Sequence, residues 1–351
     1  MCECMKNNYA NPSAAYSAAG NARKELRTTK KILAGMLGCT MQEIYFTSGG
    51  TEANNWALMQ AAGKHVVLSA IEHHSVLLAA KKMGCDITFV KPECNGRIDP
   101  AKVAAAIRTD TVLISVQYAN NETGVLQPAA EIAEIAKKHG VLYHCDAVQA
   151  FGHIPVDVSE CRADFISASA HKLYAPKGIG FLYIRQGTGV LPMIMGGGQE
   201  YNMRAGTENI AAICGFGVAA QLARDDMQER IDKGHRLRNL LVSLLDKKAL
   251  SIAELCKDSE RVPGITALLL PGIESEEAIA KLDLQGIMVS GGAACASKSS
   301  RSSHVFDAMG LSEKQVRCVI RISTGRNTTE AEITAAADAI ASIFQNYTQL
   351  K

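Results

Sequence analysis

Two apolar stretches predict the fold most clearly: Val141-Leu142-Tyr143-His144-Cys145-Asp146 and Asp164-Phe165-Ile166-Ser167-Ala168-Ser169-Ala170-His171-Lys172. Each contains a short, β-rich run, Val141–Cys145 and Asp164–Ser169, which polar residues follow. Similar runs are found at Glu43–Thr47, His65–Ser69, Asp86–Val90, Thr111–Val116 and Gly180–Ile184. Segments of helical composition, such as Ala129–Lys138, separate most of these runs. Apolar strands that alternate with helices predict an α/β fold whose large, mostly parallel seven-stranded sheet is covered on both faces.

The alternation stops at a long helical stretch from about Glu208 to Lys248, whose second half is polar. Beyond it the chain mixes segments of strand and helix character, at Gly264–Leu270, Ser275–Leu284, Ile287–Ser290, Val319–Ser323 and Thr329–Phe344. The last of these begins with a helix-capping pattern at Thr328–Glu332. We therefore expect a large domain over residues 14–250 and a smaller α+β domain over residues 251–351.

The charge balance argues against a nucleic-acid or membrane partner. The 351 residues carry 37 basic and 35 acidic side chains, a net charge of +2, and 47% of them are hydrophobic. That composition is typical of a folded globular protein. A net charge this close to zero does not attract nucleic acid or an anionic lipid surface strongly. The sequence has no apolar run of about 18–20 residues and no signal-peptide core near Met1. A cytoplasmic location is the expectation.

The eleven cysteines are an odd number and are scattered along the chain. No pair of Cys-x-x-Cys motifs is present, so we expect free thiols and no metal site. Cys295 is set apart by its surroundings, the glycine- and serine-rich stretch Ser290–Ser303 with Lys298 and Arg301 close by. Neighbouring positive charge favours the thiolate, which makes Cys295 the candidate reactive thiol.

Polar groups follow five of the predicted strands at the point where each strand ends. They are Ser48-Gly49-Gly50-Thr51, Glu72-His73-His74, Asn120-Asn121-Glu122, Asp146, and Ser169-Ala170-His171-Lys172. Ligands of open α/β sheets bind beyond the carboxyl ends of the strands. We therefore expect these five groups to meet in one site.

The chemistry of these groups suggests one cofactor. A glycine turn before a helix suits a single phosphate, although it is equally typical of a tight turn with a threonine cap. A carboxylate such as Asp146 at a buried strand end needs a partner: either a cation, or the N-terminus of a following helix that it caps. If that helix begins directly after Asp146, Gln149 would face the same side as Asp146. Burial among small residues lowers the pKa of a lysine such as Lys172 and makes its amine a nucleophile. A phosphate cradle, a lysine and a carboxylate are the parts that pyridoxal phosphate requires.

At this point the chain resembles a known family, the cysteine desulfurases of the NifS/IscS type. These are class V aminotransferases with the type I pyridoxal phosphate-dependent transferase fold. The resemblance runs from Asn11-Pro12-Ser13 to the C-terminal helix. Its strongest motifs are Phe46–Glu52, Asn120–Gly124, Ser169–Lys172 with Pro176-Lys177-Gly178, and Ser290–Cys295.

The resemblance implies a role for each matching residue. Lys172 would bind the pyridoxal 5'-phosphate aldehyde, Asp146 would pair with its ring nitrogen, and Gln149 would hydrogen-bond its ring hydroxyl oxygen. His73 would stack on the ring and transfer protons. The phosphate would be held by Gly50, Thr51, Ser169 and His171. Thr207 would reach the phosphate of a neighbouring subunit, which implies a homodimer. The substrate would be bound by Asn11, Asn121 and Arg321, with the arginine fork on the carboxylate.

The implied reaction converts L-cysteine to L-alanine. Lys172 would take the proton from the substrate Cα, and Cys295 would attack the substrate sulfur and keep it as a persulfide. An acceptor or scaffold protein would then collect the sulfur for iron–sulfur cluster assembly or for thiolation of tRNA and cofactors. The serine-rich stretch after Cys295 resembles the long-loop subgroup.

Three other interpretations remain open from the sequence. The chain could be a selenocysteine lyase, since the two substrates differ only at the chalcogen, or an ordinary aminotransferase, against which Cys295 argues. It could also be a truncated, inactive dimerising form, because the N-terminal strand of the family and its scaffold-docking C-terminal extension are expected to be absent. The presence of Lys172, Asp146, His73 and Cys295 together argues against that interpretation.

Overall fold

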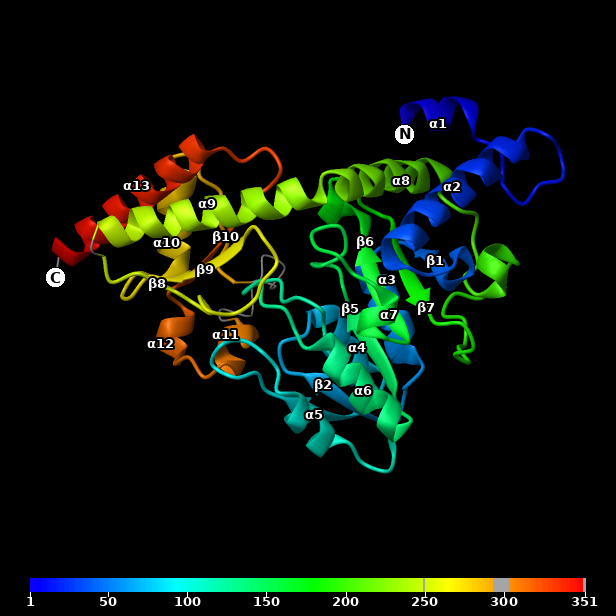
Figure 1. The fold of residues 1–351 in the computed structure, drawn as a ribbon, viewed down its shortest axis with the longest axis horizontal. Helices are drawn as coiled ribbons and strands as arrows, with labels where there is room; N and C mark the ends of the chain where they lie inside the picture. The colour runs from blue at the N-terminus through cyan, green and yellow to red at the C-terminus, as the bar shows by residue number, and fades with distance from the viewer. Residues whose placement is uncertain (249, 293–302, 350–351) are drawn as a thin grey trace. The chain divides into compact units, whose positions relative to one another are not determined.

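The computed structural model describes residues 1–248, 250–292 and 303–349, which form two units (Figure 1). The first unit comprises Met1–Val90, Pro100–Tyr118 and Pro128–Met227. The second comprises Lys91–Asp99, Ala119–Gln127 and Gln228–Lys351. The chain therefore passes from one unit to the other more than once.

A seven-stranded sheet forms the centre of the first unit, as the sequence predicts. Its strands are β1 (Ile44–Thr47), β2 (His65–Ser69), β3 (Asp86–Val90), β4 (Thr111–Ser115), β5 (Leu142–Asp146), β6 (Phe165–Ser169) and β7 (Gly180–Ile184), in the order β1-β7-β6-β5-β4-β2-β3. Only β7 runs antiparallel to its neighbours β1 and β6. Strands β2, β6 and β7 are buried along their whole length, which explains why they appear as continuous apolar runs.

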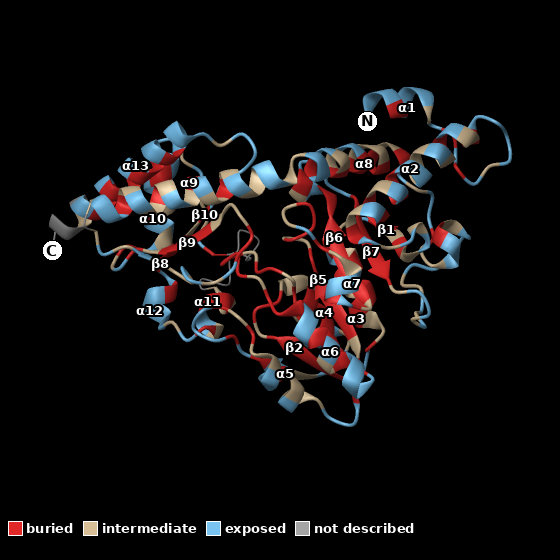
Figure 2. Cartoon of the chain, viewed as in Figure 1, coloured by how far each residue is buried: buried red, intermediate tan, exposed pale blue. Residues whose placement is uncertain are grey.

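The helices of the first unit bury one face each, and their outer faces are exposed (Figure 2). They are α1 (Cys2–Asn7), α2 (Ala19–Leu37), α3 (Gly50–Met59), α4 (His74–Lys82), α5 (Pro100–Ala106), α6 (Ala129–His139), α7 (Val158–Cys161) and α8 (Ile210–Asp225). In α6, Ile132, Ala133 and Ala136 form the buried face, and Gly140 ends the helix in the left-handed conformation that glycine adopts without strain.

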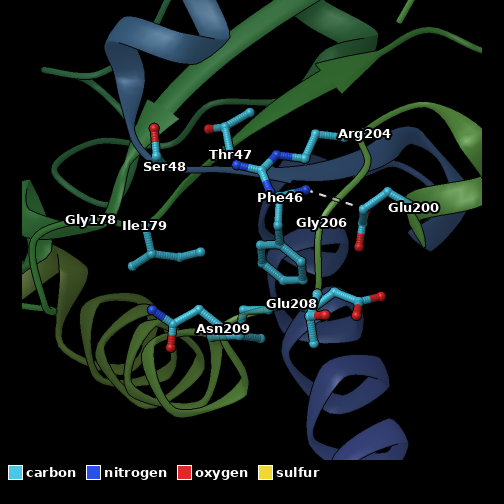
Figure 3. A pocket seen from close by; sticks show the side chains of 12 residues that line it. Phe46, Thr47, Ser48, Gly178, Ile179, Glu200, Arg204, Gly206, Glu208 and Asn209 are labelled. Carbon is cyan, nitrogen blue, oxygen red and sulfur yellow. Dashed lines mark hydrogen bonds between the residues drawn. The ribbon is translucent and has the colours of Figure 1, made fainter. Parts of the chain in front are cut away.

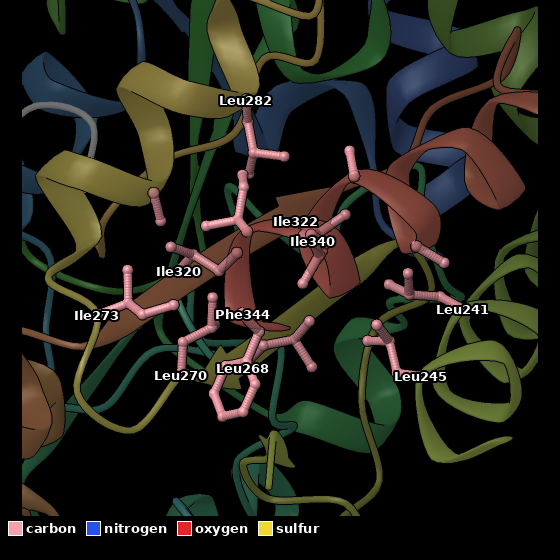
Figure 4. Packing of buried hydrophobic residues seen from close by; sticks show 14 of the residues in the cluster. Leu241, Leu245, Leu268, Leu270, Ile273, Leu282, Ile320, Ile322, Ile340 and Phe344 are labelled. Atoms are coloured by element: carbon pink, nitrogen blue, oxygen red, sulfur yellow. The ribbon is translucent and has the colours of Figure 1, made fainter. Parts of the chain in front are cut away.

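The second unit is built on a three-stranded antiparallel sheet of order β10-β9-β8. Its strands are β8 (Ala253–Glu254), β9 (Ile265–Leu269) and β10 (Val319–Ser323), and its helices are α9 (Met227–Lys247), α10 (Ser275–Asp283), α11 (His304–Ala308), α12 (Glu313–Val316) and α13 (Glu330–Gln349). Leu241 and Leu245 of α9 pack with Leu268, Ile320 and Ile340 in one buried cluster (Figure 4). This cluster is the core of the second unit.

Three sequence expectations differ from this fold. The domain boundary expected at residue 250 falls at Met227 instead, because the buried leucines of α9 belong to the core of the second unit. The long helix is divided into α8 and α9 at Asp226. The strand expected at residues 287–290 is reduced to a single bridge between Ser290 and Arg321. None of the helices in the described part of the chain is long and apolar enough to cross a membrane.

Candidate active site

Asp146 is the buried end of β5, in the middle of the large sheet. Its Oδ1 accepts a hydrogen bond from the Val148 backbone N–H at 2.9 Å, and its Oδ2 accepts one from Asn54 Nδ2 at 2.7 Å. Burial raises the pKa of the Asp146 carboxyl, and these two hydrogen bonds and the charges of His73 and Lys172 oppose that rise. A buried carboxyl of this kind favours a positively charged partner, such as a protonated ring nitrogen.

A chain of hydrogen bonds connects Asp146 to His73. Asn54 Nδ2 also donates to the Ser75 hydroxyl at 2.8 Å, and this hydroxyl lies 2.7 Å from His73 Nδ1. The Ser75 backbone N–H donates to the same nitrogen at 3.1 Å. Burial lowers the pKa of His73. The ring is therefore neutral at pH 7, and because Nδ1 accepts hydrogen bonds its proton lies on Nε2.

The glycine turn after β1 packs tightly against the ends of two other strands. A Cβ atom on Gly50 would lie 2.7 Å from Val148 Cγ2, and one on Gly180 would lie 2.5 Å from the Ala168 carbonyl oxygen. Ser169, the last residue of β6, lies against the same turn, and its Oγ is 2.9 Å from His171 Nδ1. Gly50 and Thr51 open α3, so their N–H groups and the Ser169 hydroxyl form a cradle suited to an anion.

Lys172 lies in a short 3₁₀ helix, Ala170–Leu173, directly after β6. Two contacts fix the position of this turn. His153 Nε2 is 3.0 Å from the Lys172 carbonyl oxygen, and Leu173 packs so closely on Gly152 that a Cβ on Gly152 would clash with Leu173 Cδ2. The Lys172 side chain is half-buried and its charge acts on both Asp146 and His73. The lysine, the carboxylate and the imidazole therefore belong to one cluster.

Glu72 is a fully buried carboxyl beside this cluster. It accepts hydrogen bonds from the Ser69 hydroxyl and from the Gln117 backbone N–H, which lies 2.8 Å away. Burial raises the pKa of Glu72 to about 8, in spite of these two donors. Glu72, which directly precedes His73 in the sequence, therefore links the end of β2 to the loop after β4.

Thr207 is an exposed residue of the loop before α8. It lines a cavity of about 230 Å³ together with residues of β1 and of the loops before β7 and α8 (Figure 3). Arg204 on the same loop donates to both oxygens of Glu52, through Nε at 2.9 Å and Nη2 at 3.1 Å, and the Ser48 N–H donates to Glu52 at 2.7 Å. This bidentate pair fixes the loop to the first turn of α3.

Glu200, which also lines this cavity, forms a buried ion pair with Lys30. Lys30 Nζ is 2.6 Å from Glu200 Oε2, both side chains are 3% exposed, and Glu200 also accepts from the Phe46 N–H at 3.3 Å (Figure 3). Burial raises the pKa of Glu200, although the Lys30 charge opposes this. Three aromatic rings surround the Lys30 ammonium within 6 Å.

We expect Lys30→Met to lower the free energy of unfolding by about 3–5 kcal/mol, because it leaves the Glu200 carboxylate buried without its cation. Urea denaturation followed by circular dichroism measures this. Lys281→Met is the matched control, since its partner Glu277 is exposed and the pair contributes less than about 1 kcal/mol. Equal losses in the two variants would contradict the argument. In the double variant Lys30→Met/Glu200→Gln, most of the loss should be recovered.

Asn121 and Arg321 are in contact with each other in the second unit. Arg321 Nη1 donates to the Asn121 carbonyl oxygen at 2.9 Å. The Arg321 backbone pairs with Ala267 of β9 on one side and with Ser290 on the other. Asn120 fixes the turn that carries Asn121, because its Oδ1 accepts from the N–H groups of Glu122 and Thr123. The arginine is therefore held at a fixed place on the second unit.

Two further predicted site residues, Asn11 and Gln149, lie in turns. Asn11 is exposed, and its Oδ1 accepts from the Ser13 N–H at 2.9 Å in a local turn. Gln149 lies in a turn after β5, where Ala150 N–H donates to Ala147, so the helix expected there does not form. Cys295, in residues 293–302, lies outside the described part of the chain.

The cysteines of the described residues are all free thiols, and they range from buried to exposed. Cys2 and Cys94 are exposed. Burial raises the pKa of Cys39 to about 12 and that of Cys256 to about 11, which keeps both thiols protonated. No group of three or more His, Cys, Asp or Glu side chains in the described residues could hold a metal ion.

Sequence reasoning missed three residues of these clusters. Asn54 and Ser75 connect Asp146 to His73, and Glu122 is buried beside Asn121 and Arg321. The signal for Asn54 was its place inside α3, where an amide between apolar neighbours such as Ala53 and Trp56 needs a buried partner. Glu122 belongs to a quoted motif, but nothing in the sequence shows that its carboxyl is buried.

Comparison with known proteins agrees with this arrangement. The model of the family "Aminotransferase class-V" matches residues 1–335. The chain belongs to the class V aminotransferase family. It is 38% identical over 350 residues to the cysteine desulfurase IscS of Dictyoglomus turgidum, covering 97% of this chain and 89% of the relative. Of the class V structures, a NifS-like protein superposes with a TM-score of 0.91 at 31% identity, covering 98% of this chain and 94% of the other. A NifS-like protein from Rickettsia africae superposes with a TM-score of 0.89 at 32% identity, with the same coverage.

Class V aminotransferases generally depend on pyridoxal phosphate, and the first unit fits that cofactor. The glycine cradle leaves no room for a Cβ on Gly50, and Asn54 Oδ1 is a buried acceptor that has no hydrogen-bond partner among the described residues. The donor set also matches, since an anion cradle, a buried carboxyl and a lysine occur together. The expected type I fold is confirmed by these structural relatives.

Proposed function

We propose that the chain is a pyridoxal phosphate-dependent cysteine desulfurase that converts L-cysteine to L-alanine and retains the sulfur as a persulfide. The observation that carries the proposal is the Asp146 carboxyl, buried at a strand end and held by Asn54 and Val148 beside His73 and Lys172. The similarity to IscS proteins over nearly the whole chain supports the same activity.

Each residue of the first unit has a defined task in this reaction. The bound cofactor supplies an electron sink for the pair released when the substrate Cα loses its proton. Asp146 holds the proton on the ring nitrogen, which keeps that sink effective. Lys172 anchors the cofactor aldehyde and then moves the Cα proton. Gly50, Thr51, Ser169 and His171 would hold the phosphate, and His73, with its proton on Nε2, would lie against the ring and transfer protons.

The substrate and the sulfur are handled by the other residues. The Arg321 guanidinium binds the substrate carboxylate, with Asn121 beside it. The Cys295 thiolate attacks the substrate sulfur: an S–S bond forms, the Cβ–S bond breaks, and its electron pair stays with the carbon that becomes the methyl group of alanine after protonation. The persulfide then passes its outer sulfur to an acceptor protein.

We propose a homodimer, in which Thr207 would reach the cofactor phosphate of a second copy. The Thr207 side chain is exposed on the loop that the Arg204–Glu52 pair fixes, so it is available to that phosphate. Sedimentation at micromolar concentration should give the mass of two chains, and a monomer would contradict this part of the proposal.

The experiment that tests the function is an absorbance spectrum of the purified chain with pyridoxal phosphate, before and after addition of L-cysteine, with alanine measured in parallel. We expect a yellow protein whose spectrum changes and which releases alanine. Cys295→Ala should keep the cofactor absorbance but form no persulfide, because its thiol is the sulfur acceptor. Cys94→Ala, which removes an exposed thiol of the described residues, is the control and should react normally. A colourless protein that releases no alanine would refute the proposal.

A further inference from the structure

Glu122 is a buried carboxyl of the second unit that the mechanism above leaves without a task. It is 1% exposed. Its Oε2 accepts a hydrogen bond from the Ser303 hydroxyl at 2.5 Å, and its Oε1 has no hydrogen-bond partner among the described residues. Burial raises the pKa of Glu122 to about 7, while the Ser303 hydroxyl and the Arg321 charge oppose the rise. Burying a carboxyl group with an unsatisfied oxygen costs free energy, and a purely structural role seldom requires it.

Gly292 and Ser303 meet at this carboxyl. A Cβ on Gly292 would lie 2.8 Å from Glu122 Oε2 and 3.0 Å from Ser303 Cβ, and the φ of Gly292 is +62°. Only glycine fits that position without strain. Ser303 also caps α11, since its Oγ accepts from the Val305 and Phe306 N–H groups at 3.2 and 3.4 Å. One carboxyl therefore fixes both residues that border residues 293–302.

The position of Glu122 itself is fixed by the turn before it. Asn120 Oδ1 accepts from the Glu122 N–H at 2.8 Å, and the Asn121 carbonyl oxygen binds Arg321. The three residues Asn120, Asn121 and Glu122 thus connect the substrate-binding arginine to the two points where residues 293–302 join the fold. Cys295 is the third residue after Gly292 in the sequence.

We propose that Glu122 is a positioning residue for sulfur transfer: through Gly292 and Ser303 it sets where the Cys295-bearing residues start and end relative to Arg321. This inference rests on the proposed function and assigns a role to a residue that does not itself touch the reacting atoms. Glu122 would exert this positioning role mainly through its hydrogen bond to Ser303.

The test compares Glu122→Ala, Glu122→Gln and Ser303→Ala in the full chain loaded with pyridoxal phosphate. Ser312→Ala is the matched control, because Ser312 caps α12 in the same way and does not contact Glu122. One readout is the rate of persulfide formation on Cys295 after addition of L-cysteine, measured by mass spectrometry of the Cys295 peptide. The other is the rate at which iodoacetamide alkylates Cys295 without L-cysteine.

We expect Glu122→Ala and Ser303→Ala to slow persulfide formation about tenfold or more, the change that the loss of one hydrogen bond to a charged group produces. Their alkylation rates should also differ from wild type, while the cofactor absorbance stays the same. Glu122→Gln should recover most of the rate, because its amide oxygen can accept from Ser303. Persulfide and alkylation rates equal to those of Ser312→Ala would overturn the proposal.

The test remains decisive if one variant does not fold or if the wild type forms no persulfide. If Glu122→Ala does not fold, Ser303→Ala removes the same hydrogen bond from the other side and decides the question alone. If wild type forms no persulfide from L-cysteine, the proposed function fails. The alkylation rates then still show whether Glu122 controls Cys295, and equal rates in all variants would overturn that role too.

Discussion

Lys172→Ala should abolish the visible absorbance of the chain loaded with pyridoxal phosphate and lower alanine formation from L-cysteine by at least about a thousandfold. The reason is that the single amine serves twice, as the attachment point of the cofactor and as the base that moves the Cα proton. The contacts of His153 and Gly152 fix the turn that carries Lys172, so no other lysine of the first unit takes its place beside Asp146.

Lys177→Ala is the control for this prediction. Lys177 lies five residues further along the same segment and its side chain is exposed. It should keep the absorbance and the rate of wild type. Gel filtration of both variants after loading shows whether colour stays with the protein. If Lys172→Ala keeps a bound yellow cofactor that borohydride still fixes to the chain, another lysine is the attachment point.

The sequence predicted the large sheet well because its strands are buried on both faces. Strands β2, β3 and β7 have the predicted bounds, β1, β4 and β6 differ from prediction by one residue at one end, and β5 is shifted by one residue at both ends. Burial on both faces favours apolar residues along most of such a strand, as in β2, β6 and β7, and that signal is local. The grouping of Asp146, Lys172, Gly50 and His73 followed from topology, since the ends of parallel strands share one edge.

The parts that sequence reasoning missed depend on contacts between distant segments. Asn54 and Asp146 are 92 positions apart, and Glu122 and Ser303 are 181 apart. No local pattern encodes such pairs. The boundary at Met227 was missed for a related reason, because the polar surface of α9 resembles a connecting helix and only the packing of Leu237, Leu241 and Leu245 assigns it to the second unit.

Asp146→Asn should lower alanine formation by about a hundredfold or more while the chain still binds the cofactor through Lys172. The amide keeps the shape of the side chain and its one oxygen can still accept from the Val148 N–H, but it loses the second acceptor, which binds Asn54, and it carries no charge to hold a proton on the ring nitrogen. The measurement is kcat for alanine release together with the cofactor spectrum. Asp164→Asn is the control, because Asp164 pairs with Arg185 and the Tyr143 N–H at the start of β6.

Asn54→Ala distinguishes the charge of Asp146 from its placement. This variant leaves the carboxylate in place but removes one of its hydrogen bonds and the link to Ser75 and His73. We expect a loss of about tenfold, the value of one hydrogen bond to a charged group, because the remaining Val148 N–H still orients the carboxyl. Since Asn54 and Asp146 act on the same proton, the double variant should be no slower than Asp146→Asn. Independent, multiplying losses would show that Asn54 contributes to catalysis by a route that does not include Asp146.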